Sequence, residues 1–187
     1  MAIGTRDALV HAAESLMRTK GYAAFSYADL AEIVGIRKAS IHHHFPTKEV
    51  LGIAIVEDYI ARVRGNFERI EREHKDLVGR LDAFFLVFRA SSGGGLLPLC
   101  GALAAEMAAL PSGLQELTHQ FFDVQLKWLM AILDKGVANG EIPCGRGTRQ
   151  KAFLLLSVLE GASFINWATK ESDSIDNNII GLIIEKT

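Results

Sequence analysis

A chain of 187 residues with 49% hydrophobic residues is long enough to bury a sizeable core, so its composition excludes no globular class and requires no disorder. Its formal net charge of −2 argues against a protein that coats nucleic acid indiscriminately, and any contact with DNA must come from a local patch. The two cysteines, Cys100 and Cys144, are too few for a disulfide framework and lack metal-ligand spacing.

Targeting signals are not evident in the sequence. The first residues, MAIGTRDALVHAAES, contain no apolar segment of the signal-peptide type, and we find no window of about eighteen uncharged apolar residues. The sequence therefore predicts a cytoplasmic protein with no membrane partner.

The first predicted helix runs from an N-cap at Thr5 to the residue before Gly21. Its apolar residues recur at helical spacing and form one stripe, which consists of Leu9, Ala12, Ala13, Leu16 and Met17. We expect this stripe to pack over the helices that follow.

The second predicted helix begins after Ser26. Asp29 follows three residues later, so the Ser26 hydroxyl can cap free N–H groups while the carboxylate lies near the positive end of the helix dipole. Apolar residues then recur at spacings of three and four, and Gly35 follows where the chain must turn sharply. These signals predict a short helix that ends at Gly35.

The third predicted helix covers residues 37–44 and carries a basic outer face. Ile41 and Phe45 are the inward residues, and Pro46 stops the helix before Thr47 caps the next one. The outer face is left to Arg37, Lys38, Ser40, His42 and His43. From residue 37 through 48 there are three cations and no acid, which would attract a duplex backbone. Two short helices joined at a glycine, the second one basic, have the layout of a DNA-reading helix-turn-helix.

Six more helices are predicted, which makes about nine in an all-α fold. They cover residues 48–74, 76–90, 99–110, 112–139, 148–169 and 174–185. The glycine-rich segment at 91–95 cannot continue a regular helix, and Pro111 separates the fourth from the third of these helices.

A metal site is not expected at the three consecutive histidines. Successive helical residues point about 100° apart, so His42, His43 and His44 cannot converge on one ion. Contact with DNA is the better interpretation. We also find no phosphate-binding loop, nucleophile elbow or pair of catalytic acids, so we expect no enzyme, no catalytic residue and no cofactor.

The N-terminal quarter resembles the TetR family of transcriptional regulators. The resemblance is carried by Thr5, Arg6, Gly21, Tyr22, Phe25, Ser26, Leu30, Ala31, Val34, Gly35, Lys38, Ala39, Ser40, Ile41, His44, Phe45 and Lys48. It implies a helix-turn-helix DNA-binding domain over 1–47 and a helical ligand-binding and dimerisation domain over 48–187. The family usually has tyrosine at the position of His42.

Roles on DNA are assigned by position in this pattern. Ser26, Tyr27 and Lys48 are predicted to contact phosphates. The residues predicted to face base edges are Arg37, Lys38, Ser40, His42 and His43. Lys38 is equally suited to bind a phosphate. The candidate DNA-binding surface also includes Ala39 and His44. The expected partner is a palindromic double-stranded DNA operator, read by a twofold homodimer.

The C-terminal helices carry apolar residues that suggest a dimer face. The candidates are Phe153, Leu156, Leu159, Gly161, Ser163, Ile179 and Ile183. The alternative is that these helices cover the core of one chain. The family resemblance favours dimerisation, because its members generally dimerise through their last two long helices.

A second group of apolar residues is a candidate inducer pocket, because the family usually encloses one in its C-terminal helices. The group consists of Phe84, Phe88, Cys100, Leu103, Met107, Phe121, Phe122, Trp128, Phe164 and Trp167. Ordinary core packing is the alternative for each residue. Together these features predict a repressor that a small hydrophobic inducer releases from its operator.

Two further interpretations stay open. Cys100 lies near a predicted helix N-terminus, where the dipole favours thiolate, and precedes an L-x-x-E pattern, Leu103 to Glu106, that resembles electrophile-responsive members of the family. It could be a redox sensor or a small buried hydrophobe. More distantly, the chain could be a helical ligand-binding bundle with no role on DNA.

Overall fold

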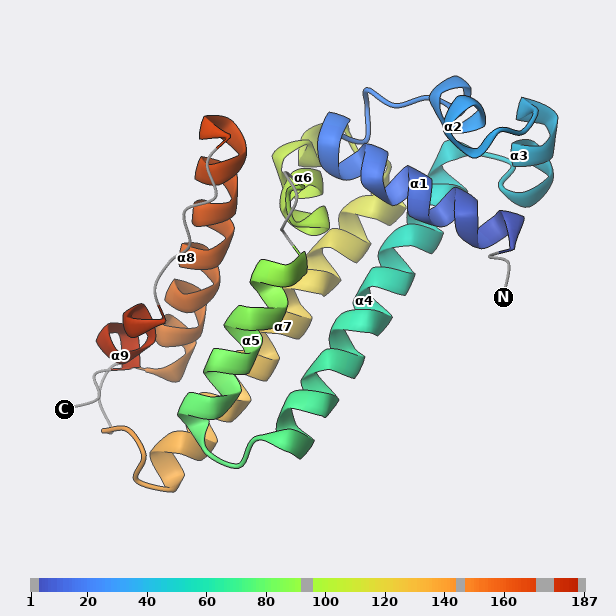
Figure 1. Ribbon diagram of the computed structural model, residues 1–187. Helices are drawn as coiled ribbons and strands as arrows, with labels where there is room; N and C mark the ends of the chain where they lie inside the picture. Colours follow the sequence, from blue (N-terminus) through green and yellow to red (C-terminus); the bar gives the residue numbers. More distant parts are fainter. Residues whose placement is uncertain (1–3, 92–95, 144–146, 171–176, 185–187) are drawn as a thin grey trace. The chain divides into compact units, whose positions relative to one another are not determined.

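The computed structural model describes residues 4–91, 96–143, 147–170 and 177–184 (Figure 1). These residues form nine α-helices and one short 3-10 helix, and no strand occurs among them. The predicted all-α fold with an N-terminal helix-turn-helix is therefore confirmed.

The helices have the following bounds in chain order. They are α1 (Thr5–Lys20), α2 (Tyr27–Val34), α3 (Lys38–His44), α4 (Lys48–Glu73), α5 (Leu77–Ser91), α6 (Leu99–Ala105), the 3-10 helix η1 (Met107–Ala109), α7 (Ser112–Ala138), α8 (Thr148–Thr169) and α9 (Asn178–Ile184).

Two predicted helices differ from the structure, and a third is only partly described. Thr5 is the first residue of α1 and not its cap, because Gly4 occupies the N-cap position without a side chain to bond. The helix predicted over 99–110 is broken, since α6 ends at Ala105 and a 3-10 turn follows. The last predicted helix, 174–185, is described only as Asn178–Ile184, and most of its first turn lies outside the described residues.

The chain divides into two compact units. The first unit comprises Met1–Ala61 and Leu96–Phe121, and the second comprises Arg62–Gly95 and Phe122–Thr187. This division falls within α4 and within α7. The predicted domain boundary after residue 47 stays a prediction.

In the first unit, α1 packs against α2 and α6, and α2 packs against α3. The apolar stripe predicted for α1 lies in this core, where Leu9, Ala13 and Met17 are fully buried. Leu30 from α2 and Ile41 from α3 are also fully buried. These apolar contacts fix the positions of the two short helices, which would be marginal on their own.

In the second unit, one apolar cluster joins α5, α7, α8, α9 and the end of α4. The rings of Phe67 and Trp128 stack at 4.3 Å in its centre, and Phe84 lies 5.6 Å from Trp128. α9 contacts α5 and α8 (Figure 1). The buried Lys151 of α8 donates a 3.1 Å hydrogen bond to the Ile184 carbonyl, which neutralises part of the negative end of α9.

Candidate DNA-binding interface

The start of α2 is held by the capping box that the sequence predicts. The Ser26 hydroxyl accepts hydrogen bonds from the N–H groups of Ala28 (3.2 Å) and Asp29 (3.4 Å). The Asp29 carboxylate accepts from the Ser26 N–H at 2.8 Å and from its hydroxyl at 2.5 Å. These hydrogen bonds and one from Lys20 hold the pKa of Asp29 well below its usual range. The Ser26 hydroxyl is saturated in this arrangement, so it has no free proton for a phosphate.

The turn between α2 and α3 is built on Gly35. Its φ of 73° places it in the left-handed region, and its N–H donates to the Ala31 carbonyl at 2.9 Å. Ile36 donates to the same carbonyl at 3.1 Å. This αL cap ends α2 and directs the chain into α3, as predicted.

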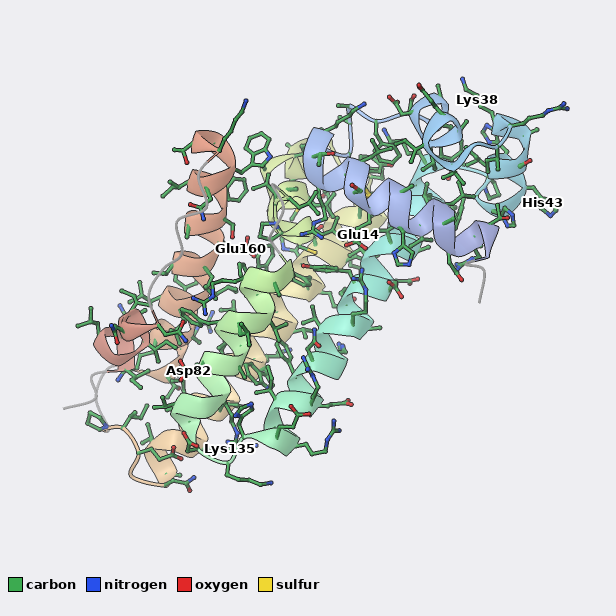
Figure 2. All side chains as sticks on the ribbon, in the orientation of Figure 1. Glu14, Lys38, His43, Asp82, Lys135 and Glu160 are labelled. Carbon is green, nitrogen blue, oxygen red and sulfur yellow. The ribbon has the colours of Figure 1, made fainter. Side chains whose placement is uncertain are left out.

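The outer face of α3 carries the residues that the sequence predicts for DNA. Ile41 and Phe45 are buried, as expected for the inward positions. The exposed residues are Arg37, Lys38, Ala39, Ser40, His42 and His43, while His44 is half-buried. Figure 2 shows Lys38 and His43 at the outer edge that α3 forms. The structure therefore brings most of the predicted base-reading residues together on one solvent-facing surface.

His42 takes part in fixing the end of α3. Its Nδ1 lies 3.2 Å from the Pro46 carbonyl oxygen, and its ring packs edge to face against Tyr27 with centroids 4.9 Å apart. Because a carbonyl oxygen only accepts, Nδ1 must carry the proton of this hydrogen bond. In the neutral imidazole the exposed side chain then offers Nε2 as an acceptor.

Tyr27 braces the same segment from α2. Its hydroxyl donates a 2.9 Å hydrogen bond to the Phe45 carbonyl. Burial raises the pKa of the Tyr27 phenol to about 12, so the group keeps its proton at physiological pH. Its predicted phosphate contact would require the hydroxyl to be shared with this internal bond.

Lys48 is an internal bridge as well as a candidate phosphate ligand. Its ammonium donates to the carbonyls of Phe25 (2.6 Å) and Ala23 (3.3 Å). The same ammonium lies 4.4 Å from the centre of the Phe25 ring and 4.7 Å from that of Tyr22. Partial burial lowers the pKa of Lys48, against the opposing effect of Glu106 and Asp29. These contacts tie the first turn of α4 to the segment before α2.

Glu106 is a positioning residue that the sequence did not identify for this role. Its carboxylate accepts hydrogen bonds from the N–H groups of Tyr22 and Ala23, both at 2.9 Å. Gly21, at φ 88°, makes room for this carboxylate, because a Cβ there would collide with it. The buried Arg18 adds a second connection, since its Nε donates to the Leu97 carbonyl at 2.7 Å.

The predicted pocket residues are divided between the two units of the chain. Phe84, Phe88 and Trp128 lie in the apolar cluster of the second unit, and Phe122 packs against that cluster. Phe164 is half-buried and Trp167 is 46% exposed. The other four belong to the first unit, where Cys100, Leu103 and Phe121 are buried and Met107 is half-buried.

Cys100 has no accessible surface in the described chain. A thiol that reacts with electrophiles needs to be reached by them, so this burial gives the sensor interpretation no support. Cys144 lies outside the described residues. Within the part of the chain that is described, no three His, Cys, Asp or Glu side chains gather where they could hold a metal ion.

The predicted dimer residues fall into two groups. Leu156, Leu159 and Ile183 lie in the cluster of their own chain, which accounts for their burial without a partner. By contrast, Phe153 is 64% exposed, and Gly161, about two turns further along α8, is also exposed. Ser163 and Ile179 are half-buried. The exposed apolar surface of α8 also includes Leu154 and Ile165.

Among the described residues, α8 is the single helix that is long and apolar enough, by length and composition alone, to cross a membrane. Only 22% of its most apolar window is buried inside the chain. A helix that buries one face in a protein interface is also long, apolar and exposed in the single chain. The composition of α8 alone therefore does not indicate a membrane span.

Comparison with known proteins identifies the architecture. The family model described as "Bacterial regulatory proteins, tetR family" matches residues 9–55, which include α2, α3 and the first turns of α4. A crystal structure of a TetR-family transcriptional regulator from Agrobacterium tumefaciens superposes with a TM-score of 0.84 and 28% identity, over 97% of this chain and 94% of that one.

Two curated relatives are also transcriptional regulators. The HTH-type transcriptional regulator CymR of Pseudomonas putida is 29% identical over 75% of this chain and 71% of its own length. The HTH-type transcriptional repressor ComR of Escherichia coli (strain K12) is 26% identical over 84% of this chain and 77% of its own. With the helix-turn-helix geometry described above, these matches show that the chain belongs to the TetR family of DNA-binding transcriptional regulators.

Proposed function

We propose that this chain is a homodimeric repressor that binds a palindromic operator through α3. The observation that carries the proposal is the exposed face of α3, which is basic and polar and contains no acid. A helix of this kind, whose C-terminal end is held by the hydrogen bond from Tyr27 to the Phe45 carbonyl, is suited to lie in a major groove. Two copies related by a twofold axis would read two half-sites.

The side chains of α3 divide by the contacts they can make. Arg37 and Lys38 are exposed cations that can bind phosphates or the acceptor edge of guanine. Ser40 and His43 are exposed and can exchange hydrogen bonds with base edges. His42, with its Nδ1 proton directed at Pro46, can accept from a base amino group through Nε2.

Dimerisation through α8 completes the proposal. Phe153, Leu154 and Ile165 expose large apolar side chains on a long helix of the second unit. Burying this surface against its symmetry mate would remove it from water and set the spacing of the two α3 helices.

A small hydrophobic molecule is the proposed inducer. The second unit contains a buried aromatic cluster around Trp128, and apolar side chains of this kind would line the site for such a ligand. The ligand must bind the DNA-free arrangement more tightly than the DNA-bound one, since equal affinity would shift nothing. In keeping with its family, the protein would act in the cytoplasm and have a regulatory and not a catalytic role.

The experiment compares two cations at matched exposure. A duplex is first selected from a random library by the wild-type chain, and its affinity for Lys38→Ala and Arg64→Ala is measured by fluorescence anisotropy. Lys38 lies on α3 and Arg64 on α4, and both are exposed. Lys38→Ala should weaken binding and lower the slope of log affinity against log salt by about 1, while Arg64→Ala should change neither. Equal behaviour of the two variants would contradict the proposed interface.

A further inference from the structure

Glu160 is a carboxylate enclosed by its own chain without a hydrogen-bond partner. It lies on α8, and both of its side-chain oxygens are inaccessible to solvent and unpaired among the described residues. Figure 2 shows Glu160 on the side of α8 that is turned toward α5. α5 and α8 belong to the same unit and share its apolar cluster.

The surroundings of Glu160 are apolar. Leu156, one helical turn before it, belongs to the cluster of the second unit, and Phe164, one turn after it, is half-buried. Loss of hydration raises the pKa of the Glu160 carboxyl to about 7, and no neighbouring cation opposes this effect. A buried carboxylate without a partner is costly, and a protein usually keeps one only where something pairs with it.

Gln125 on α7 carries a buried hydrogen-bond donor that lacks an acceptor. Its side chain is 2% exposed, and its Nε2 has no hydrogen-bond partner among the described residues. Phe122 and Trp128, each one turn away, pack against or within the same apolar cluster. The second unit therefore contains an unpaired acceptor on α8 and an unpaired donor on α7, which do not bond each other.

The second chain of a dimer does not supply the missing hydrogen-bond partner of Glu160. The Glu160 oxygens are inaccessible already in one chain, whereas the surface proposed for dimerisation consists of the exposed Phe153, Leu154 and Ile165. A group that pairs with Glu160 must therefore enter the second unit itself.

We propose that Glu160 and Gln125 are the polar recognition groups of the inducer site and that they select an apolar or aromatic molecule carrying a protonated amine. The ammonium donates to the Glu160 carboxylate, a charge-assisted hydrogen bond that strengthens in an apolar setting. The Gln125 amide donates to an acceptor elsewhere on the molecule. This inference rests on the proposed regulation by a small hydrophobic ligand and specifies its chemical class.

The test uses pairs of compounds that differ only in charge. The pairs are benzylamine with benzyl alcohol, 2-phenylethylamine with 2-phenylethanol, and 1-naphthylmethylamine with 1-naphthalenemethanol. Their dissociation constants are measured by calorimetry at pH 8 for the wild-type chain, Glu160→Gln and Glu116→Gln. Glu116 is an exposed carboxylate on α7 and serves as the matched control.

The wild-type chain and Glu116→Gln should bind at least one amine roughly tenfold or more tightly than its alcohol. Glu160→Gln should abolish this preference while it retains the helical circular dichroism of the wild type. The inference is overturned if no amine binds, if both members of every pair bind equally, or if the preference survives Glu160→Gln.

Operator binding without ligand separates this inference from the proposed function. If the wild-type chain binds its selected duplex but does not bind the amines more tightly than the alcohols, only the assignment of the ligand class is wrong. If the wild-type chain selects no duplex, the proposed repressor function fails, whatever the amines do.

Discussion

The carboxylate of Glu106 accepts a 2.9 Å hydrogen bond from the backbone N–H of Tyr22, which lies 84 residues earlier in the chain. The second oxygen accepts from Ala23, the next residue. One side chain at the end of α6 thus satisfies two donors in the turn between α1 and α2. Since α2 begins shortly after this turn, the position of the helix-turn-helix depends on the residue that follows α6.

The first prediction concerns Glu106→Gln. An amide has one acceptor oxygen, so one of the two backbone N–H groups would face an NH₂ group and lose its partner. We expect the free energy of unfolding to fall by about 1–3 kcal/mol in urea denaturation, and operator affinity to weaken. Glu116→Gln, an exposed control on α7, should leave both unchanged. Equal stability of Glu106→Gln and wild type would show that the carboxylate does not brace the turn.

The second prediction concerns Lys48→Met. Methionine keeps an apolar stem but removes the ammonium that bonds the Phe25 carbonyl and lies over the Phe25 ring. We expect a loss of about 1–2 kcal/mol in the free energy of unfolding.

Lys38→Met is the control for this change, because Lys38 is exposed on α3 and should tolerate it without loss of stability. If Lys48→Met lost operator affinity but kept the stability of the wild type, Lys48 would contact DNA without stabilising the fold.

Local signals in the sequence were sufficient to predict the helix-turn-helix. The capping box between Ser26 and Asp29 and the turn at Gly35 each depend on residues within four positions, and the structure has both. The helical period likewise predicted that Ile41 and Phe45 are buried. At this range, the backbone geometry of a helix decides which side chains meet.

Contacts between distant segments could not be predicted in this way. The bonds from Glu106 to Tyr22 and from Lys48 to Phe25 join residues 84 and 23 positions apart. The break of the predicted 99–110 helix occurs at Glu106 itself, where the carboxylate is directed to the turn between α1 and α2. The grouping of the candidate pocket residues stays a prediction, because helical period says which face is apolar but not which helix covers it.

The third prediction concerns the pH dependence of stability. The pKa of Glu160 is raised from 4.5 to about 7 in the folded chain, so the folded state holds this proton more tightly than the unfolded state. The resulting stabilisation is complete below the unfolded pKa and is lost as pH rises through about 7.

Glu160→Gln removes this titration. Relative to the variant, the wild type should lose on the order of 3 kcal/mol of unfolding free energy between low and high pH. Urea denaturation of both proteins at pH 5 and pH 8 measures the difference. A constant difference between the two proteins across this range would show that Glu160 titrates normally.

The fourth prediction concerns Ile165→Glu. Ile165 on α8 is 64% exposed, and Leu86 on α5 is 63% exposed. A charge in an apolar interface is strongly unfavourable, so Ile165→Glu should be monomeric in light scattering while Leu86→Glu stays dimeric. The monomer should also bind a palindromic duplex less tightly. A dimeric Ile165→Glu protein would place the interface elsewhere.

Sequence-specific DNA binding by the wild-type chain is the most direct test of the proposed repressor function. Fluorescence anisotropy, at one fixed physiological salt concentration, compares the duplex selected from a random library with a scrambled duplex of the same composition. The selected sequence should be palindromic, and the wild-type chain should bind it about 1,000-fold or more tightly than the scrambled one. Equal affinity for the two duplexes, or selection that enriches no sequence, would contradict the proposed repressor function.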